Sequence, residues 1–146
     1  MRIALGSDHA GFALKEHVKQ TLQAEGHDVT DVGATSTESA DYPGFAHQAA
    51  ALVGAGEAEL AVLACGSGVG VSIVANKVRG VRAVNAHDAE EAAQSRRHND
   101  VNVVTLSGAR LDGAQADDIV AAFLATDFEG GRHARRVDQI GELESA

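Results

Sequence analysis

The sequence predicts an α/β protein, a Rossmann-like three-layer α/β/α sandwich built around a five-stranded parallel sheet. Short apolar runs alternate with amphipathic segments along the chain, and this alternation is typical of βαβ units whose helices cover both faces of a parallel sheet. Residues 60–64 form an uninterrupted apolar run, as expected of a strand that is buried on both faces. The length of 146 residues fits a single domain, which we expect to comprise residues 1–146.

Local patterns define the elements of the first half of the chain. Leu14, Val18 and Leu22 recur every four residues, which predicts a helix, and Gly26 can end that helix. The polar stretch after the second strand contains Pro43, the only proline, and predicts the longest loop. We expect strands at residues 2–6, 28–32 and 60–65, helices at residues 12–25 and 45–53, and the loop at residues 33–44.

The second half of the chain continues the alternation of helices and strands. Ile119, Val120, Phe123 and Leu124 mark one face of an amphipathic helix that begins near Asp112. We expect strands at residues 81–84 and 101–106, helices at residues 71–77, 89–98 and from about 112 onward, and a polar C-terminal helix at about 132–143.

Composition and charge limit the partners and the location. A formal net charge of −9 and a pI of about 5.1 argue against nucleic acid and against an anionic membrane as partners. A phosphorylated substrate would therefore need a local cluster of cationic side chains. The single cysteine excludes an internal disulfide and fits a reducing compartment. Because the first residues turn polar early and no apolar run reaches the ~18 residues of a membrane span, we expect a cytoplasmic protein.

The stretch from Cys65 to Gly70 is the most informative part of the sequence. Cys65 ends a predicted buried strand, glycines follow at Gly66, Gly68 and Gly70, and a helical pattern comes next. Such a loop exposes backbone N–H groups at a helix N-terminus, which favours a bound anion and a thiolate. Cys65 is therefore a candidate base or nucleophile. Ligands of parallel sheets bind beyond the carboxyl ends of strands, so we expect residues 7–11 and 66–70 to share one crevice.

Other interpretations of this loop are possible. A phosphate-binding loop of the Cys-x5-Arg kind needs arginine at position 71, where this chain has Val71, and no Gly-Lys-Ser/Thr completes a P-loop. A dinucleotide site, with Asp88 as the acid that binds ribose, remains a minority interpretation because the spacing is G-x-G-x-G rather than G-x-G-x-x-G. Cys65 can also be a small buried residue without chemistry.

Polar residues at two predicted helix ends are further candidates. Asp8 and His9 lie in the first βα turn, where an aspartate can also serve as a helix N-cap. His98 and Asn99 precede Asp100 at the end of a helix, where capping is an alternative explanation.

Two arginines form a further candidate site, and the sequence shows no pattern of metal ligands. Arg132 and Arg136 lie four residues apart on one predicted helix face, where they can bind one phosphate or remain a solvated pair. We expect no metal, because no group of His, Cys, Asp and Glu residues has the spacing of metal ligands. Four other histidines lack a motif and are expected at the surface: His17, His27, His47 and His87.

Six segments in this order resemble one family of enzymes. They are residues 6–12 (GSDHAGF), 41–43 (DYP), 65–70 (CGSGVG), 75–77 (ANK), 98–100 (HND) and 129–133 (EGGRH). Together they resemble the type B ribose-5-phosphate isomerases, of the family shared with allose- and galactose-6-phosphate isomerases. The resemblance spans roughly residues 2–140.

The resemblance implies an aldose–ketose isomerase that interconverts D-ribose 5-phosphate and D-ribulose 5-phosphate through an enediolate, without a cofactor. Cys65 would be the base that moves a proton between C2 and C1, and Ser67 would help to move a proton between the two oxygens. The backbone N–H groups of Gly66, Gly68, Val69 and Gly70 would hold the oxyanion. One branch of the family lacks this cysteine and uses a glutamate in the helix after the loop. The position that matches this glutamate is Val71 here, which leaves Cys65 as the only evident base.

The remaining roles follow from the same resemblance. His98, with Asp8, would open the sugar ring; His9, Arg132 and Arg136 would bind the phosphate, with Arg110 as a further candidate; Tyr42 and Asn99 would contact the substrate. Family members are homodimers or homotetramers with sites shared between subunits, so His98, Asn99 and Arg110 would come from the neighbouring chain. Alternatives are an isomerase of another sugar phosphate, such as allose 6-phosphate or a four-carbon ketose phosphate, and a non-catalytic module that binds a sugar phosphate or nucleotide.

Overall fold

Five strands form one sheet in residues 1–145, the part of the chain that the computed structural model describes. They are β1 (Arg2–Ser7), β2 (Asp28–Asp31), β3 (Leu60–Cys65), β4 (Ala83–Asn85) and β5 (Val103–Ser107). Their order across the sheet is β2-β1-β3-β5-β4, and every neighbouring pair is parallel. All six residues of the central strand β3 are buried, which explains its uninterrupted apolar run. The predicted five-stranded parallel sheet is confirmed.

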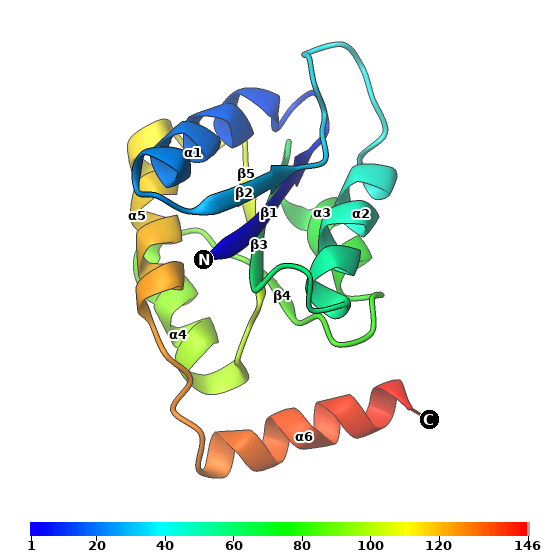
Figure 1. Ribbon diagram of the computed structural model, residues 1–146, viewed down its shortest axis with the longest axis vertical. Coiled ribbons are helices and arrows are strands. Elements are labelled where there is room, and N and C mark those ends of the chain that lie inside the picture. The colour runs from blue at the N-terminus through cyan, green and yellow to red at the C-terminus, as the bar shows by residue number, and fades with distance from the viewer. Residues whose placement is uncertain (146) are drawn as a thin grey trace.

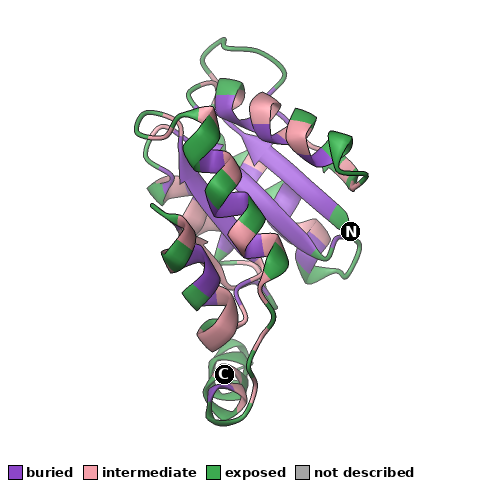
Figure 2. Cartoon of the chain, turned by 90° about the vertical axis from the view of Figure 1, so that its left-hand side faces the viewer, coloured by how far each residue is buried: buried purple, intermediate pink, exposed green. Residues whose placement is uncertain are grey.

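Helices cover both faces of this sheet, as the sequence predicts (Figure 1). They are α1 (Phe12–Ala24), α2 (Tyr42–Gly54), α3 (Val69–Ala75), α4 (Ala89–Asn99), α5 (Gly113–Ala125) and α6 (Arg132–Glu144). One buried cluster joins the sheet to α1, α4 and α5, and Leu22 and Phe123 lie at its centre. A second cluster joins the other face to α2 and α3 through small residues such as Ala49 and Ala75. Figure 2 shows the buried strands enclosed by helices whose outer faces are exposed.

The C-terminal helix α6 lies apart from both helical layers, at one end of the molecule (Figure 1). Its contacts with the rest of the fold include α4, and His133 is its buried residue. Ile140 and Leu143 are large apolar side chains that stay exposed on this helix. No helix within residues 1–145 is long and apolar enough to cross a membrane.

Several boundaries differ from the prediction, and two have clear causes. α2 begins at Tyr42 rather than at residue 45, because Asp41 takes the N-cap position and Pro43, in the first turn, suits the start of a helix. The Asn76 amide donates to Ala83 O at 3.0 Å and accepts from Ala83 N–H at 2.8 Å. This reciprocal pair joins the end of α3 to the start of β4, and α3 ends at Ala75 while β4 begins at Ala83.

A nearly buried lysine ties β2 to α1. Lys15 Nζ, on a side chain only 2% exposed, donates to both carboxylate oxygens of Asp31 at 2.8 Å and to Ala34 O at 2.6 Å. Lys19 Nζ adds a contact of 3.0 Å to Asp31. Burial alone would raise the pKa of Asp31, but the hydrogen bonds from Lys15, Gly33 N–H and Lys19 outweigh it, so the pKa lies below its ordinary value of 3.8.

Asp31 should therefore make stability depend on pH at the acid end. A carboxyl whose pKa is lower in the folded state stabilises the fold above its unfolded pKa of about 3.9, and this stabilisation is lost as the pH falls through the folded value. We expect Asp31→Asn to cost the most free energy of unfolding near neutral pH and progressively less below pH of about 4. Urea unfolding of both proteins across this range measures the difference.

Asp28→Asn is the matched control, because Asp28 begins the same strand but is exposed. We expect this change to alter the free energy of unfolding little. A difference between Asp31→Asn and the parent protein that stays constant down to the lowest pH would contradict the assignment.

Candidate active site

The strand order creates a crevice at the carboxyl ends of β1 and β3. The chain leaves β1 toward β2 on one side and leaves β3 toward β4 and β5 on the other, which makes this the switch point where ligands bind in such sheets. The predicted residues that line the crevice are Asp8, His9, Tyr42, Cys65, Gly66, Ser67, Val69 and Gly70. The loops after the first and third strands therefore share one crevice, as the sequence predicts.

Cys65 is buried at the end of β3, with 4% of the residue exposed, and its thiol is free. The N–H group of Gly68 donates to Cys65 Sγ at 3.2 Å. This hydrogen bond fixes the position of the sulfur atom at the start of the glycine-rich loop. Cys65 is therefore held at the crevice by the backbone of the loop that follows it.

Side chains from β4 and β5 determine which way the loop peptides point. Ser107 Oγ donates to Gly66 O at 2.7 Å, Thr105 Oγ1 donates to Gly68 O at 2.7 Å, and the Asn85 amide donates to Ser67 O at 3.2 Å. In a trans peptide the N–H points opposite to the preceding C=O. Holding these three carbonyls on the β4–β5 side turns the N–H groups of the following residues the other way. The N–H group of Gly68 then donates to Cys65 Sγ, and that of Val69 donates to Ser67 Oγ.

Residues outside the predicted site orient the loop after β3. Thr105 and Ser107 are buried hydroxyls within a strand whose neighbouring residues, Val104 and Leu106, are apolar. A hydroxyl pattern of this kind in a central strand is the signal that could have indicated a role in hydrogen bonding to backbone. Asn85 has no comparable signal, because it ends the short strand β4.

The glycines of the loop differ in their need for a missing side chain. Gly68 has φ +77°, and a Cβ there would lie 2.3 Å from Asn85 Oδ1. A Cβ on Gly70 would lie 2.5 Å from a ring carbon of Tyr42, so the Tyr42 ring packs directly on the Gly70 backbone. Gly66 has ordinary spacing, 3.7 Å to the nearest heavy atom, Ala10 Cβ.

Ser67 and Val69 lie at the rim of the crevice. Ser67 is exposed, and its Oγ accepts the N–H group of Val69 at 3.1 Å. Within residues 1–145 the Ser67 hydroxyl accepts this hydrogen bond and donates none. Ser67 can therefore donate a proton to an oxygen placed near Cys65 and accept one from it.

Asp8 and His9 are held in place by backbone. Asp8 is buried, and its Oδ1 accepts the N–H group of Gly11 at 3.0 Å, which closes the turn between β1 and α1. The N-cap of α1 is Gly11, so the alternative in which Asp8 caps the helix is wrong; Asp8 stands three residues earlier. His9 Nδ1 lies 3.2 Å from Ala40 O and 3.1 Å from Ala40 N, which fixes the ring and leaves Nε2 for a ligand.

Gly68 is buried within the loop, and five other predicted residues lie away from this crevice in the same chain. His98 and Asn99 form the last turn of α4, Arg110 is exposed in the turn after β5, and Arg132 and Arg136 are exposed on α6. Figure 1 places α6 at the opposite end of the molecule from the long loop between β2 and α2. This loop carries Ala40, the residue that His9 of the crevice contacts. One chain therefore brings the thiol and its loop together with Asp8, His9 and Tyr42, and it leaves most of the predicted cationic groups elsewhere.

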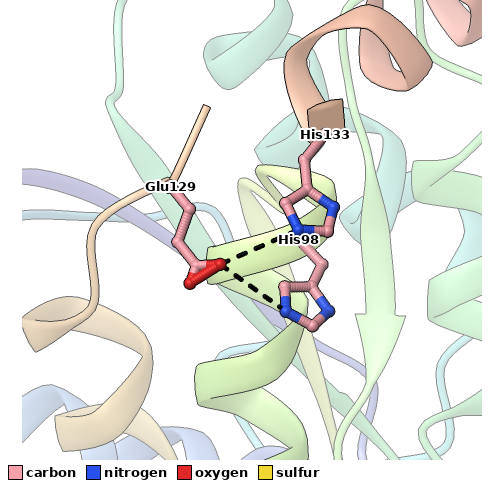
Figure 3. Close-up of side chains that lie close together, drawn as sticks. All are labelled: His98, Glu129 and His133. Carbon is pink, nitrogen blue, oxygen red and sulfur yellow. Dashed lines mark ion pairs between the residues drawn. The ribbon is translucent and has the colours of Figure 1, made fainter. Parts of the chain in front are cut away.

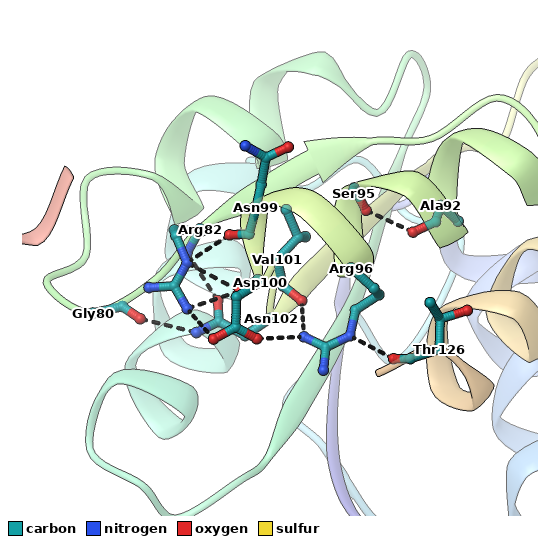
Figure 4. A network of polar contacts seen from close by, with 10 residues as sticks. All are labelled: Gly80, Arg82, Ala92, Ser95, Arg96, Asn99, Asp100, Val101, Asn102 and Thr126. Carbon is teal, nitrogen blue, oxygen red and sulfur yellow. Dashed lines mark hydrogen bonds and ion pairs between the residues drawn. The ribbon is translucent and has the colours of Figure 1, made fainter. Parts of the chain in front are cut away.

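The end of α4 is fixed by two arginines around one aspartate (Figure 4). Asp100 is the C-cap, with a φ of +47° that is uncommon for a residue other than glycine. Arg96 Nη1 and Arg82 Nη2 contact its two carboxylate oxygens at 3.2 and 3.3 Å, and Arg82 also donates to Asp100 O at 2.8 Å. Capping therefore explains Asp100, whereas the side chains of His98 and Asn99 take no part in it.

His98 packs against the first turn of α6 (Figure 3). Its ring stacks on His133 with centroids 4.3 Å apart and planes within 10°. Burial, and next the positive charges of His98 and Arg132, lower the pKa of His133 below its ordinary value, with Glu129 opposing them. The sequence did not reveal this cluster, because its members come from two separate elements.

The crevice combines the buried Cys65 thiol, the exposed Ser67 hydroxyl and the backbone of a glycine-rich loop. These features define a site for proton transfer on a small polar molecule. A family model described as Ribose/Galactose Isomerase matches residues 3–140. The chain belongs to this family.

Similar proteins cover nearly the whole chain. Ribose-5-phosphate isomerase B of Escherichia coli is 45% identical over 144 residues, which make up 98% of this chain and 96% of that protein. The solved structure of ribose-5-phosphate isomerase B from Clostridium thermocellum matches with a TM-score of 0.98 and 43% identity, covering 99% of this chain and 98% of the other. That of the Mycoplasma genitalium enzyme, with bound ribulose 5-phosphate, matches with a TM-score of 0.95 and 38% identity, covering 99% and 96%.

Proposed function

We propose that this protein is a type B ribose-5-phosphate isomerase, with Cys65 as the base that converts D-ribose 5-phosphate and D-ribulose 5-phosphate into one another. The observation that carries the assignment is the buried Cys65 thiol that accepts the Gly68 N–H group at 3.2 Å, in the crevice between β1 and β3. The family match over residues 3–140 and the bound ribulose 5-phosphate of the Mycoplasma genitalium relative support the same reaction.

The chemistry follows from the arrangement of the loop. The Cys65 thiolate removes the proton from C2 of the open-chain aldose, and the electron pair moves to the carbonyl oxygen O1. The backbone N–H groups of residues 66–70 that do not already donate to Cys65 Sγ or Ser67 Oγ stabilise the charge that develops there. Removal of one such donor typically costs about 3–4 kcal/mol of transition-state stabilisation. Ser67 moves a proton between O2 and O1, and the Cys65 thiol then returns its proton to C1.

Ring opening and phosphate binding require groups that the crevice of one chain does not contain. His98, Asn99, Arg132 and Arg136 lie together at the α4–α6 end, and Arg110 is exposed after β5. In a homodimer or homotetramer, a neighbouring subunit supplies these residues to the crevice. His98 then opens the ring with Asp8, while His9 and the arginines bind the phosphate, which supplies the positive charge that a net charge of −9 requires locally.

The reaction is tested directly with the parent protein. Ribose 5-phosphate is incubated with chelator and without nicotinamide, and the ketose formed is measured; allose 6-phosphate and a four-carbon ketose phosphate are assayed in parallel. The highest kcat/KM is expected for ribose 5-phosphate. Preference for another sugar phosphate would change the substrate assignment, and ligand binding without any turnover would identify a binding module.

Sites shared between subunits predict complementation between two inactive variants. Cys65→Ala and His98→Asn are each expected to lose activity, whereas their mixture after joint refolding should recover about a quarter of the parent activity, since half of the dimers are mixed and half of their sites are intact. Isomerase assays before and after mixing measure this.

The matched control mixes Cys65→Ala with Asp8→Asn. Both residues line the same crevice of one chain, so each mixed dimer keeps one defect in each crevice. No recovery is expected from this pair. Equal recovery in both mixtures, or none in either, would contradict the sharing of sites between subunits. Neither result would change the assignment of the reaction, because the parent protein is assayed for that separately.

A further inference from the structure

Two side chains outside the crevice hold two consecutive peptides of the loop after β3. The Asn85 amide, at the end of β4, donates to Ser67 O at 3.2 Å. Thr105 Oγ1, on β5, donates to Gly68 O at 2.7 Å. Thr105 is buried, Asn85 is partly buried, and neither side chain lines the crevice. Both act on the loop from the side of β4 and β5.

Each of these two peptides provides a hydrogen bond to one of the proposed proton carriers. In the peptide that joins Ser67 to Gly68, the N–H group donates to Cys65 Sγ at 3.2 Å. In the peptide that joins Gly68 to Val69, the N–H group donates to Ser67 Oγ at 3.1 Å. Because the C=O and N–H groups of a trans peptide point in opposite directions, a side chain that fixes the carbonyl also fixes the direction of the N–H group.

The peptide before these two is held in a different way. Gly66 O accepts the N–H group of Ala109 at 3.1 Å in addition to the hydroxyl of Ser107, so a backbone donor also fixes its direction. Asn85 and Thr105 instead lie side by side, with Thr105 Oγ1 3.4 Å from Asn85 Oδ1. This pair of side chains therefore serves the two peptides whose N–H groups contact the proton carriers.

We propose that Asn85 and Thr105 are positioning residues for the two proton transfers of the isomerisation. Asn85 fixes the N–H group that holds the Cys65 sulfur toward C2 of the substrate. Thr105 fixes the N–H group that holds the Ser67 hydroxyl toward O1 and O2. This division of roles rests on the proposed function, in which Cys65 moves the proton between C2 and C1 and Ser67 moves the proton between the two oxygens.

Two substitutions of Thr105 separate positioning from packing. Valine keeps nearly the shape of threonine without the hydroxyl, whereas serine keeps the hydroxyl without the methyl group. We expect Thr105→Val to lower kcat by about 10- to 10²-fold with little change in KM, because a misplacement of about 1 Å can cost 10²-fold in rate. Thr105→Ser should keep most of the parent kcat. The reverse order would assign Thr105 to packing alone and overturn the proposal.

Deuterium at C2 of ribose 5-phosphate distinguishes the two roles. Asn85→Ala should slow the step in which Cys65 removes this atom, so the isotope effect on kcat should rise above the parent value. Thr105→Val should slow the later transfer by Ser67, so cleavage of the C2–H bond limits the rate less and the isotope effect should fall toward unity. Equal isotope effects in the parent and in both variants would overturn the separate roles.

Ser95→Ala is the matched control. Ser95 is buried in α4, and its Oγ donates to Ala92 O at 2.7 Å, the same kind and length of bond that Thr105 makes with the loop. Because this bond lies within one helix, kcat and the isotope effect should stay at their parent values. A loss of kcat as large as in Thr105→Val would show that any lost buried hydroxyl lowers activity, and would overturn the proposal.

The direction of the N–H groups is measured without substrate, by residual dipolar couplings on the isotopically labelled full chain. Thr105→Val should change the coupling of Val69 N–H, and Asn85→Ala that of Gly68 N–H, while the couplings of α1 stay at their parent values. Unchanged couplings at Val69 and Gly68 would overturn the proposal. Because this measurement needs no turnover, it distinguishes a failure of positioning from a failure of the proposed function.

Discussion

Cys65→Ala is expected to fold and to lose nearly all isomerase activity. The methyl group fits the buried end of β3, but it cannot accept the proton from C2, and removal of a positioned acid–base group typically lowers turnover by about 10²–10⁴-fold. The change also leaves the Gly68 N–H group without its sulfur acceptor, which should cost about 1–3 kcal/mol of stability. Turnover of ribose 5-phosphate and urea unfolding, measured on the same preparations, test both parts.

Cys65→Ser separates these two effects. A serine oxygen can accept the Gly68 N–H group, so part of the lost stability should return, but a hydroxyl is a much weaker acid than a thiol and provides almost no anion at neutral pH. We therefore expect Cys65→Ser to be more stable than Cys65→Ala and as inactive. Substantial turnover in either variant would show that Cys65 is not the base and that another group in the crevice accepts the proton.

The parts of the site that the sequence predicts are local. Cys65 and the glycines after it lie on one strand–loop–helix segment, so their periodicity and composition carry the information, and the switch-point rule brings the turn with Asp8 and His9 to the same crevice. Tyr42 joins them because α2 begins early, at Asp41 and Pro43. The sequence contains this capping pattern, although the polar composition of residues 33–44 predicts a loop there.

The parts that the sequence does not predict depend on contacts between distant segments. Thr105 and Ser107 orient the loop after β3 from a different strand, and no spacing rule connects them to it. Asn76 determines the end of α3 through Ala83, and His98 meets Glu129 only because α6 folds back onto α4. Local propensity determines where elements lie, whereas these pairings arise from packing that one-dimensional patterns do not contain.

Gly11→Ala is expected to destabilise the protein strongly and to damage the crevice. A Cβ at this position would lie 2.4 Å from both the carbonyl carbon and the oxygen of Ala64, and backbone atoms of a central strand cannot move aside as a flexible side chain can. Overpacking of this kind typically costs about 1–3 kcal/mol, and a rigid neighbour favours the upper part of that range. Urea unfolding of the parent and the variant measures the loss.

Gly44→Ala is the matched control. Gly44 lies in the first turn of α2, with no heavy atom within 4 Å of the added Cβ, so alanine should increase the free energy of unfolding by about 0.5–1 kcal/mol. The two substitutions add the same methyl group and differ in what that group meets. Equal effects would show that the close approach of Gly11 to β3 does not matter to the fold.

The position of Gly11 also predicts a loss of activity beyond the loss of stability. Ala64 immediately precedes Cys65, and Gly11 N–H bonds to Asp8 Oδ1, so relief of the clash must move the turn carrying Asp8 and His9 away from the thiol. Misplacement by about 1 Å can lower an enzyme's rate by about 10²-fold. The folded fraction of Gly11→Ala should therefore convert substrate more slowly than the parent protein. A normal kcat in that fraction would mean that the turn after β1 can move without disturbing Asp8, His9 and Cys65.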